Sequence, residues 1–414
     1  MKKLSKLTLL CVSFFLISHS FLIANENSES VAVERFALYV AANNGGKERE
    51  VLRYAASDAE KLKNTMQEIG GIDSKNSIIL TEPNQIEVEK ALQKFAEKVN
   101  SAKETARRTE FIFYYSGHSD ENALLLGEES YGYSQLKSAI NSVPSDIHVV
   151  MLDSCFSGNF IRAKGGSRQK SFLVDESSVV SGHAYLSSSS ESEASQESDL
   201  IQSSFFTHAL ITGLRGAADS SGDNKISLNE LYHYAFNETL SQTEQSTIGT
   251  QHPSFDITLV GSGDLVLSDI STAESILVLN SDLQGKIYIR NNDTGVLISE
   301  IKKSAGNSIP LALSSGNYKV TMIQENQTFE SNVKLKAGRS VSLLAKKFKK
   351  VNTTDTRTRG GTFIQNEQPS SENKNDIYKD LPETESADKF FDLNGNLEDI
   401  RNNAMDTINK LQKK

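Results

Sequence analysis

The amino-acid sequence predicts an α/β domain with a mostly parallel sheet flanked by helices, followed by a small all-β sandwich and a disordered tail. Two runs, 111–115 and 149–152, are apolar on both faces and too short for helices, which is typical of buried parallel strands. Stretches with helical periodicity separate the strands of this region, and such alternation indicates βαβ units. After residue 272, short strands follow one another with turn residues between them and no helical stretch.

The α/β domain is expected over residues 34–268. Its predicted strands are 35–41, 77–80, 111–115, 123–126, 149–152 and 184–186, and the stretch 259–267 closes the region. Its predicted helices are 52–69, 86–99, 133–140, 205–214 and 228–240, each with apolar residues at helical spacing. Ser57 or Asp58 is expected to support the start of the first helix, and Gly216 to end the fourth.

The sandwich is expected over 272–346. Its predicted strands are 276–279, 286–289, 296–298, 318–322, 333–335 and 341–344. The turn and strand at 313–320 resemble those of PEGA or carboxypeptidase-regulatory-like modules. Residues 351–390 are polar with few apolar side chains, which predicts a disordered linker. Apolar residues at helical spacing over 395–412 predict a closing amphipathic helix.

The composition of the 414-residue chain limits the functions open to it. The length is enough for two or three domains, and a hydrophobic fraction of 37% is low for one compact globule. The net charge of −9 argues against nucleic-acid binding as the main task. An acidic surface also agrees, weakly, with cationic substrates.

The N-terminus has the pattern of a secretory signal peptide, expected over 1–24. A positively charged start, 1–6, precedes an apolar stretch, with cleavage after Ser20 or Ala24. This predicts an exported protein, periplasmic or secreted, that does not contact a membrane once the signal is removed. The alternative is an uncleaved membrane anchor, since the apolar stretch is almost long enough to span a bilayer.

Each of the two buried strands is followed by a reactive side chain near a glycine. His118 comes after Gly117, and Cys155 lies three residues before Gly158. Ligands of open α/β sheets bind at the carboxyl ends of the strands, so a base and a thiol are expected at one edge of the sheet. The other cysteine, Cys11, lies in the signal peptide, so Cys155 is either a small buried hydrophobic residue or a nucleophile.

A cysteine with a nearby imidazole is suited to nucleophilic catalysis. The attacking species is the thiolate, and an imidazole takes the thiol proton and later passes a proton to the leaving amine. The backbone N–H groups of Gly117 and Cys155 are candidate oxyanion donors, each typically worth about 3–4 kcal/mol. Such a dyad requires no cofactor, and one cysteine with scattered histidines does not predict a zinc site.

Two motifs resemble those of caspase/metacaspase-like cysteine peptidases. They are Tyr115-Ser-Gly-His118 and Asp153-Ser-Cys-Phe-Ser-Gly158, and the second is similar to the form found in metacaspases and their bacterial relatives. Those relatives usually carry His where this chain has Phe156. The resemblance covers about 34–268, including 52–59 and 260–264, and implies a caspase-like fold and a cysteine endopeptidase acting on protein or peptide substrates.

By the same resemblance, Asp153 would face the pocket for the residue before the cleaved bond (P1) and favour Arg or Lys through charge-assisted hydrogen bonds. Glu191 and Glu197 are the further candidate substrate-binding acids, with Glu193 ranked below them. The alternatives are that Asp153 only organises its loop and that 187–198 is a solvated loop. Caspases that cut after Asp would need cationic pocket residues, and no convincing set is present.

Residues 219–230 have the spacing of an EF-hand calcium loop. The candidate ligands are Asp219, Ser221, Asp223, Lys225, Ser227 and Glu230. Asn224 replaces the usual glycine at position 6, but asparagine tolerates the left-handed conformation needed there. Ca²⁺ is therefore a candidate ligand. The alternative is a loop that caps the helix beginning near Ser227.

Two functions from different classes agree with these patterns. The first is an exported cysteine endopeptidase, and the second is a catalytically silent caspase-like interaction protein acting through its sandwich and tail. Transpeptidation by the same dyad is a third reading. A basic loop at 162–182 also suggests self-processing, although a surface loop that is never cut fits equally. The oligomeric state is left open.

Overall fold

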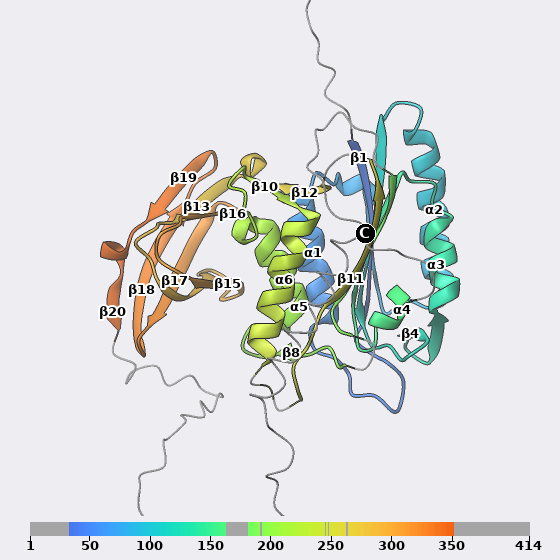
Figure 1. Cartoon of the computed structure of the whole chain (residues 1–414), viewed down its shortest axis with the longest axis horizontal. Coiled ribbons are helices and arrows are strands. Elements are labelled where there is room, and N and C mark those ends of the chain that lie inside the picture. The colour runs from blue at the N-terminus through green and yellow to red at the C-terminus, as the bar shows by residue number, and fades with distance from the viewer. Residues whose placement is uncertain are drawn as a thin grey trace, which may run out of the picture. The chain divides into compact units, whose positions relative to one another are not determined.

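The computed structural model describes residues 33–162, 181–190, 193–244, 246, 248–261 and 264–351 (Figure 1). All of them belong to the first of two compact units, Met1–Asp355. The predicted signal peptide, the closing helix over 395–412, Glu191 and nearly all of the 162–182 loop lie outside the described residues.

The described part of the chain forms a six-stranded central sheet in the order β11-β7-β6-β3-β1-β2. These strands are β1 (Val33–Ala42), β2 (Ser77–Thr81), β3 (Arg108–Gly117), β6 (Ile147–Asp153), β7 (Ser181–Ser187) and β11 (Ser254–Val260). All neighbours pair in parallel except β11, which runs antiparallel to β7. The mostly parallel sheet predicted from the sequence is confirmed.

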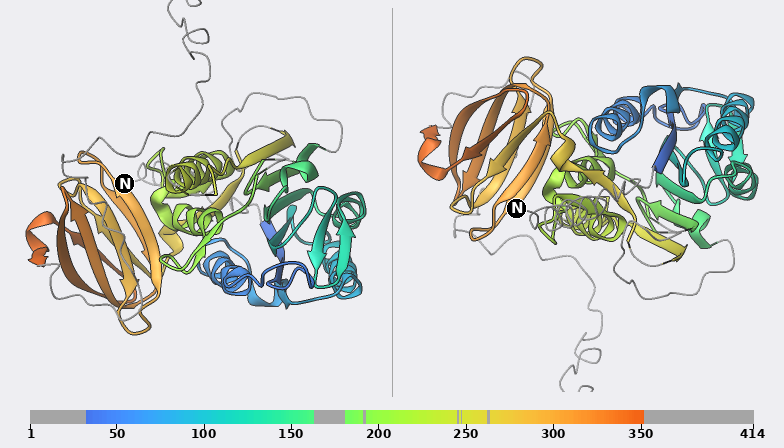
Figure 2. Two further views of the ribbon diagram at one scale, coloured as in Figure 1. Left: turned by 90° about the horizontal axis from the view of Figure 1, so that it is seen from below. Right: turned by 90° about the horizontal axis from the view of Figure 1, so that it is seen from above.

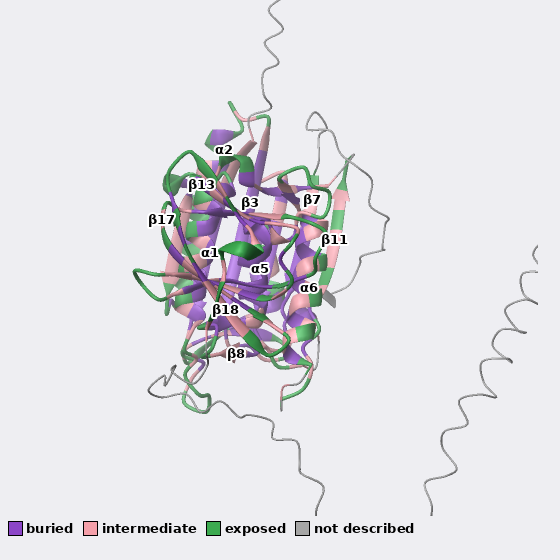
Figure 3. Cartoon of the chain, turned by 90° about the vertical axis from the view of Figure 1, so that its left-hand side faces the viewer, coloured by how far each residue is buried: buried purple, intermediate pink, exposed green. Residues whose placement is uncertain are grey.

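Helices cover both faces of this sheet (Figure 1). They are α1 (Ala55–Ile69), α2 (Gln85–Ala102), α3 (Tyr133–Asn141), α4 (Gly158–Arg162), α5 (Phe205–Thr212) and α6 (Leu228–Thr243). One core joins α1, α5 and α6 to one face of the sheet, and a second core joins α2, α3 and α4 to the other. Successive side chains of β3 point to opposite faces of the sheet, as expected for a strand. Tyr114 lies in the first core, and Phe113 and Tyr115 lie in the second. Figure 3 shows β3 as buried, whereas the edge strand β11 is largely intermediate or exposed.

Shorter elements connect these layers. They are β4 (Ala123–Leu126), β5 (Glu129–Gly132), β8 (Glu197–Ser198), β9 (Ser203–Ser204), β10 (Lys225–Ser227), β12 (Val266–Asp269), and the turns η1 (Ser74–Asn76), η2 (Gly213–Ala217) and η3 (Ile270–Thr272). The stretch 259–267, which closes the α/β domain, contains the end of β11 and the start of β12, which pair with different partners. Gly261, at φ 138°, directly follows β11.

Neither Ser57 nor Asp58 is the N-cap of α1, although the Ser57 hydroxyl donates to the Tyr54 carbonyl at 3.0 Å and Asp58 lies in the first turn. The N-cap residue is Tyr54, which makes no side-chain capping bond. Asp58 instead directs its carboxylate to Ser203 and Ser204, which precede α5. The orientation of the Asp58 carboxylate is therefore set by packing near a second helix and not by the local turn.

In the described ranges, no helix has the length and apolarity needed to cross a membrane.

After η3, the later strands form two sheets that face each other around one apolar core (orange to brown in Figure 2). They are β13 (Ser275–Leu279), β14 (Gly285–Asn291), β15 (Leu297–Lys303), β16 (Ile309–Leu313), β17 (Gly316–Gln324), β18 (Gln327–Leu335), β19 (Arg339–Leu343) and β20 (Lys349–Val351), with the turn η4 (Ala345–Lys347). Their orders are β16-β13-β19 and β15-β14-β17-β18-β20. β16 contains Pro310 and has no counterpart among the predicted strands. The resemblance to PEGA-like modules stays a prediction.

The sandwich contacts the helical layer through η2 and the end of α1. Arg215 donates from Nη1 to the carbonyl of Ala312 at 3.0 Å and to the carboxylate of Glu68 at 2.8 Å. Gly216 has φ 126°, and a Cβ placed there would lie 2.1 Å from the carbonyl oxygen of Pro310. Only glycine fits this position, because both the backbone conformation and the space exclude a side chain.

Candidate active site

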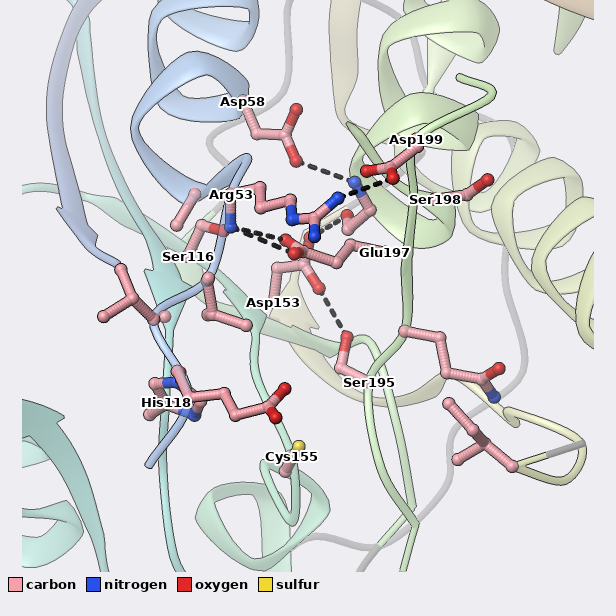
Figure 4. A pocket seen from close by; sticks show the side chains of 18 of the residues that line it. Arg53, Asp58, Ser116, His118, Asp153, Cys155, Ser195, Glu197, Ser198 and Asp199 are labelled. Carbon is pink, nitrogen blue, oxygen red and sulfur yellow. Dashed lines mark hydrogen bonds and ion pairs between the residues drawn. The ribbon is translucent and has the colours of Figure 1, made fainter. Parts of the chain in front are cut away.

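A cavity of about 920 Å³ opens at the carboxyl ends of β3 and β6 (Figure 4). His118, Asp153 and Cys155 all line it, as do Gly117 and Glu197. The first three follow or end the two central strands, so the parallel arrangement delivers a base, a carboxylate and a thiol to one edge of the sheet.

A backbone hydrogen bond and close packing against Gly45 fix the position of the His118 imidazole. Its Nε2 lies 2.7 Å from the carbonyl oxygen of Glu50. Because a carbonyl oxygen only accepts, Nε2 carries a proton, and Nδ1 of the neutral ring is the acceptor. The hydroxyl of Tyr115 donates to the His118 carbonyl at 2.6 Å and to that of Leu125 at 2.8 Å. Gly45 packs directly against the ring, and a Cβ there would lie 2.5 Å from Cδ2 of His118.

Replacing Gly45 by alanine is expected to lower kcat/KM by about 10²-fold, because the added methyl displaces an imidazole that must be placed to within an ångström. Steady-state peptide hydrolysis measures this. Gly132→Ala is the matched control, since a Cβ at Gly132 would meet nothing closer than the Gln135 amide oxygen at 3.3 Å. Equal rates for the two variants would contradict the positioning role of Gly45.

Cys155 is partly buried, and burial raises the pKa of its thiol against weaker opposing effects from the Ser195 backbone and the Arg49 charge. The next residue, Phe156, has φ 53°, a left-handed conformation that bulky residues rarely adopt and that costs of order 1–3 kcal/mol. Its N–H donates to the Glu193 carbonyl at 3.1 Å. A thiol whose pKa is raised needs a base to ionise it.

The loops that carry His118 and Cys155 are joined directly. Ser119, which is fully buried, donates its hydroxyl to the carbonyl oxygen of Cys155. The bond runs from the residue after the imidazole to the residue that bears the thiol. It fixes the spacing of the two loops without using either reactive group.

Asp153 ends β6 inside the cavity, with only 3% of the residue exposed. Its Oδ1 accepts from the Ser195 hydroxyl at 2.8 Å, and its Oδ2 accepts from the hydroxyls of Ser204 and Thr207. Within the described part of the chain it forms no ion pair. The carboxylate therefore lines the cavity and organises the surrounding loops at once.

Asp58 is a second carboxylate of this cavity, and sequence reasoning missed it as a site residue. It is fully buried and accepts from the Ser203 hydroxyl at 2.7 Å and the Ser204 N–H at 2.8 Å. Burial raises its pKa to about 7, despite the nearby Lys61 ammonium and these hydrogen bonds. Ser204 joins the two acids, because its N–H binds Asp58 and its hydroxyl binds Asp153. The available signal was the 52–59 motif, which supported the family resemblance and a helix start but was not used to predict a site residue.

Glu197 lines the cavity, but its carboxylate holds a loop. Oε1 accepts from the Arg53 N–H at 3.0 Å, and Oε2 accepts from the Tyr54 N–H at 3.3 Å. The Arg53 guanidinium pairs with Asp199 at 2.5 Å, and both side chains are about two-thirds exposed, at 67% and 66%. Figure 4 shows this group at the opposite side of the cavity from His118. Asp199 is a further acid at the mouth that the sequence reasoning missed.

Glu193 does not line the cavity and binds a histidine. Its carboxylate accepts from Nδ1 of His252 at 2.7 Å and from the His252 N–H at 2.8 Å. Burial raises the pKa of Glu193, but these donors outweigh it and hold the pKa below its ordinary value. Glu191, the other predicted acid of this segment, lies outside the described residues.

The 219–230 loop has the form of a helix cap. Glu230 completes a capping box with Ser227 and also accepts from the Ser221 N–H at 2.9 Å. Asp219 accepts from the N–H of Asn224 at 3.0 Å, and Asn224 has the left-handed φ of 66° expected for it. Among the described residues, no three His, Cys, Asp or Glu side chains converge as a metal site would require.

The caspase domain family model matches residues 34–261, more than half of the chain. Among solved structures, the crystal structure of caspase-1 from Spodoptera frugiperda is similar at 12% identity and a TM-score of 0.41. The match covers 58% of this chain and 94% of that chain. A search of curated proteins found no match. On the family model, this chain belongs to the caspase-domain family of cysteine-type peptidases.

Proposed function

We propose that this protein is an exported cysteine endopeptidase that uses His118 and Cys155 as a dyad and cleaves after Arg or Lys. The proposal rests on one observation: a nucleophile with its base and two acidic side chains line the same cavity. His118 and Cys155 line the same cavity as Asp58 and Asp153, two buried carboxylates linked by Ser204. A caspase-family site with buried acids favours a cationic side chain at P1.

In this proposal, Nδ1 of His118 takes the proton of the Cys155 thiol, and the thiolate attacks the scissile carbonyl. The Glu50 carbonyl holds Nε2, so the ring keeps the tautomer that can accept this proton. The N–H groups of Gly117 and Cys155 are the proposed oxyanion donors. The imidazolium then protonates the leaving amine, and water, deprotonated by the same ring, hydrolyses the thioester.

The deciding experiment is a peptide panel with identical flanks and Arg, Lys or Asp at P1, run beside a thiol-reactive peptide probe with a basic P1 group. The expected result is cleavage after Arg and Lys and labelling of Cys155. Preferential cleavage after Asp would overturn the pocket assignment. If the probe labels nothing at any Ca²⁺ concentration, the silent interaction protein becomes the better reading.

The titration of Asp58 gives the site a pH dependence. Its carboxyl, with a pKa near 7, is protonated below that pH and ionised above it. A bound cation favours the ionised form, so affinity for agmatine (decarboxylated arginine) is expected to rise about tenfold per pH unit up to 7 and then level off. Calorimetry on Cys155→Ala protein measures this without turnover. Adding Asp58→Asn should flatten the profile, and an unchanged profile would assign the titration to another group.

Ca²⁺ binding at 219–230 is kept as a proposal on the loop spacing and the left-handed Asn224. Binding requires Glu230 to leave the Ser221 N–H, so we expect a weak site, with Kd of about 10⁻⁴–10⁻³ M. Calorimetry at millimolar Ca²⁺ should show heat in wild type that Asp219→Ala abolishes. No heat in wild type would leave the loop as a helix cap alone.

Export concerns residues outside the described ranges, and so does nearly all of the loop proposed for self-processing. Mass spectrometry of the protein from cells, wild type beside Cys155→Ala, tests both. A mature start after Ser20 or Ala24 supports export, and an intact Met1 argues for the anchor. Fragments cut after Arg162, Lys164, Arg168 or Lys170 in wild type alone support self-processing, and identical fragments in both proteins end it.

A further inference from the structure

Three exposed apolar side chains surround the mouth of the acidic cavity. Val51, Leu200 and Ile248 line it while remaining 66%, 55% and 69% exposed. Seven large hydrophobic residues are exposed in the described ranges, and these three converge on one cavity from three separate loops. Scattered exposed apolar residues need no explanation, but a group gathered at one site indicates a contact surface.

The loops that present Leu200 and Ile248 are anchored, so their exposure is a feature of the folded chain. The Leu200 N–H donates to the Ser198 hydroxyl at 3.2 Å, and the Ile248 N–H donates to the Ser246 hydroxyl at 3.2 Å. Gln196 ties the two loops together by donating from Nε2 to the Gly249 carbonyl at 2.7 Å.

The positions of Leu200 and Ile248 indicate which side of a bound peptide they would contact. The leaving amine must lie beside His118, which protonates it. Leu200 directly follows the segment 195–199. Figure 4 shows the labelled residues of this segment across the cavity from His118. Gln196 links the same segment to the Ile248 loop. The amino-terminal side of a substrate therefore passes Leu200 and Ile248. Val51 directly follows Glu50, whose carbonyl accepts from the imidazole, so its chain position relates it to His118 and not to these two loops.

We propose that Leu200 and Ile248 form a subsite for an apolar side chain at P2, directly before the basic residue. In an extended peptide, successive side chains point to opposite faces, so P1 can enter the acidic cavity while P2 meets the rim. The substrate class is then a peptide with an apolar residue followed by Arg or Lys. This inference rests on the proposed function and adds the second determinant of specificity.

The test is a set of peptides with Arg at P1, one fixed leaving group, and Leu, Ala or Asp at P2. Wild type is expected to favour Leu over Ala by about tenfold in kcat/KM, the discrimination typical of a small hydrophobic pocket. Leu200→Ser and Ile248→Ser should each reduce this ratio to about threefold or less, because each variant should lose more activity on the Leu peptide than on the Ala peptide. Both positions are exposed, so the thermal unfolding midpoint should not change.

Ile86→Ser is the matched control, because Ile86 is 60% exposed on α2 and does not line the cavity. It should keep the wild-type Leu preference. A wild type that is indifferent to P2, or a preference that survives in both rim variants, overturns the subsite while the cleavage after Arg still stands. Cleavage of a peptide with Asp at P1, with none of the peptides that carry Arg at P1 cut, would instead overturn the proposed function, and the subsite with it.

Discussion

Replacing Cys155 by alanine, or His118 by alanine, is expected to lower kcat for a basic peptide by about 10⁴-fold or more. The first change removes the nucleophile and the second removes the base that ionises a thiol whose pKa burial has raised. Steady-state hydrolysis measures both, and the double variant should be little worse than either single one, because the two groups act as a unit.

Ser154→Ala is the matched control for the dyad variants. Ser154 adjoins the nucleophile, is buried, and its hydroxyl has no hydrogen-bond partner among the described residues. Its removal should leave kcat within a few-fold of wild type. Retention of more than about 1% of the activity by Cys155→Ala would show that another residue is the nucleophile, since removal of such a group typically costs far more.

Asp153→Asn is expected to lower kcat/KM for Arg and Lys peptides by about 10²–10³-fold. The change leaves a cationic P1 group without its buried charge partner, and removing one member of such a pair typically costs about 2–5 kcal/mol. Asparagine also brings two N–H donors toward hydroxyls that donate to Asp153, so part of the network is left unpaired. Peptide hydrolysis, with thermal unfolding run alongside, separates lost recognition from lost folding.

Two comparisons make the Asp153 result interpretable. Asp199→Asn removes an equal charge at the cavity mouth, but that side chain is 66% exposed, so the effect should be about threefold or less. Alkylation of Cys155 by a small neutral reagent should remain near the wild-type rate in Asp153→Asn. If alkylation falls as far as peptide hydrolysis, Asp153 only organises the loop that carries the thiol.

The parts of this site that the sequence predicts are those set by single strands. A run apolar on both faces identifies β3 and β6, and the edge rule for parallel sheets then places His118 and Cys155 on one side. This placement of the dyad needs only local periodicity and one topological rule, so it does not depend on how helices pack. The prediction that Asp153 faces the P1 pocket rests instead on the family resemblance.

The second carboxylate depends on packing between distant segments. Asp58 meets Ser203 and Ser204, 145 and 146 residues further along, and no local pattern marks that contact. Glu197 was predicted to face substrate, but the backbone N–H groups of Arg53 and Tyr54 occupy it. A carboxylate in a polar segment can serve substrate or backbone equally well, and only the fold decides between them.

The close packing of Gly216 against the Pro310 carbonyl has a consequence for any shortened form of this protein. The peptidase layer ends against the Pro310 strand, where Ile69 and Ile270 form a small cluster with Ala312. A fragment that stops near residue 272 would leave that apolar seam facing water and the Arg215 guanidinium without the Ala312 carbonyl. Such a fragment would tend to self-associate in solution, so the region after 272 behaves as the missing half of a surface rather than as a detachable appendage.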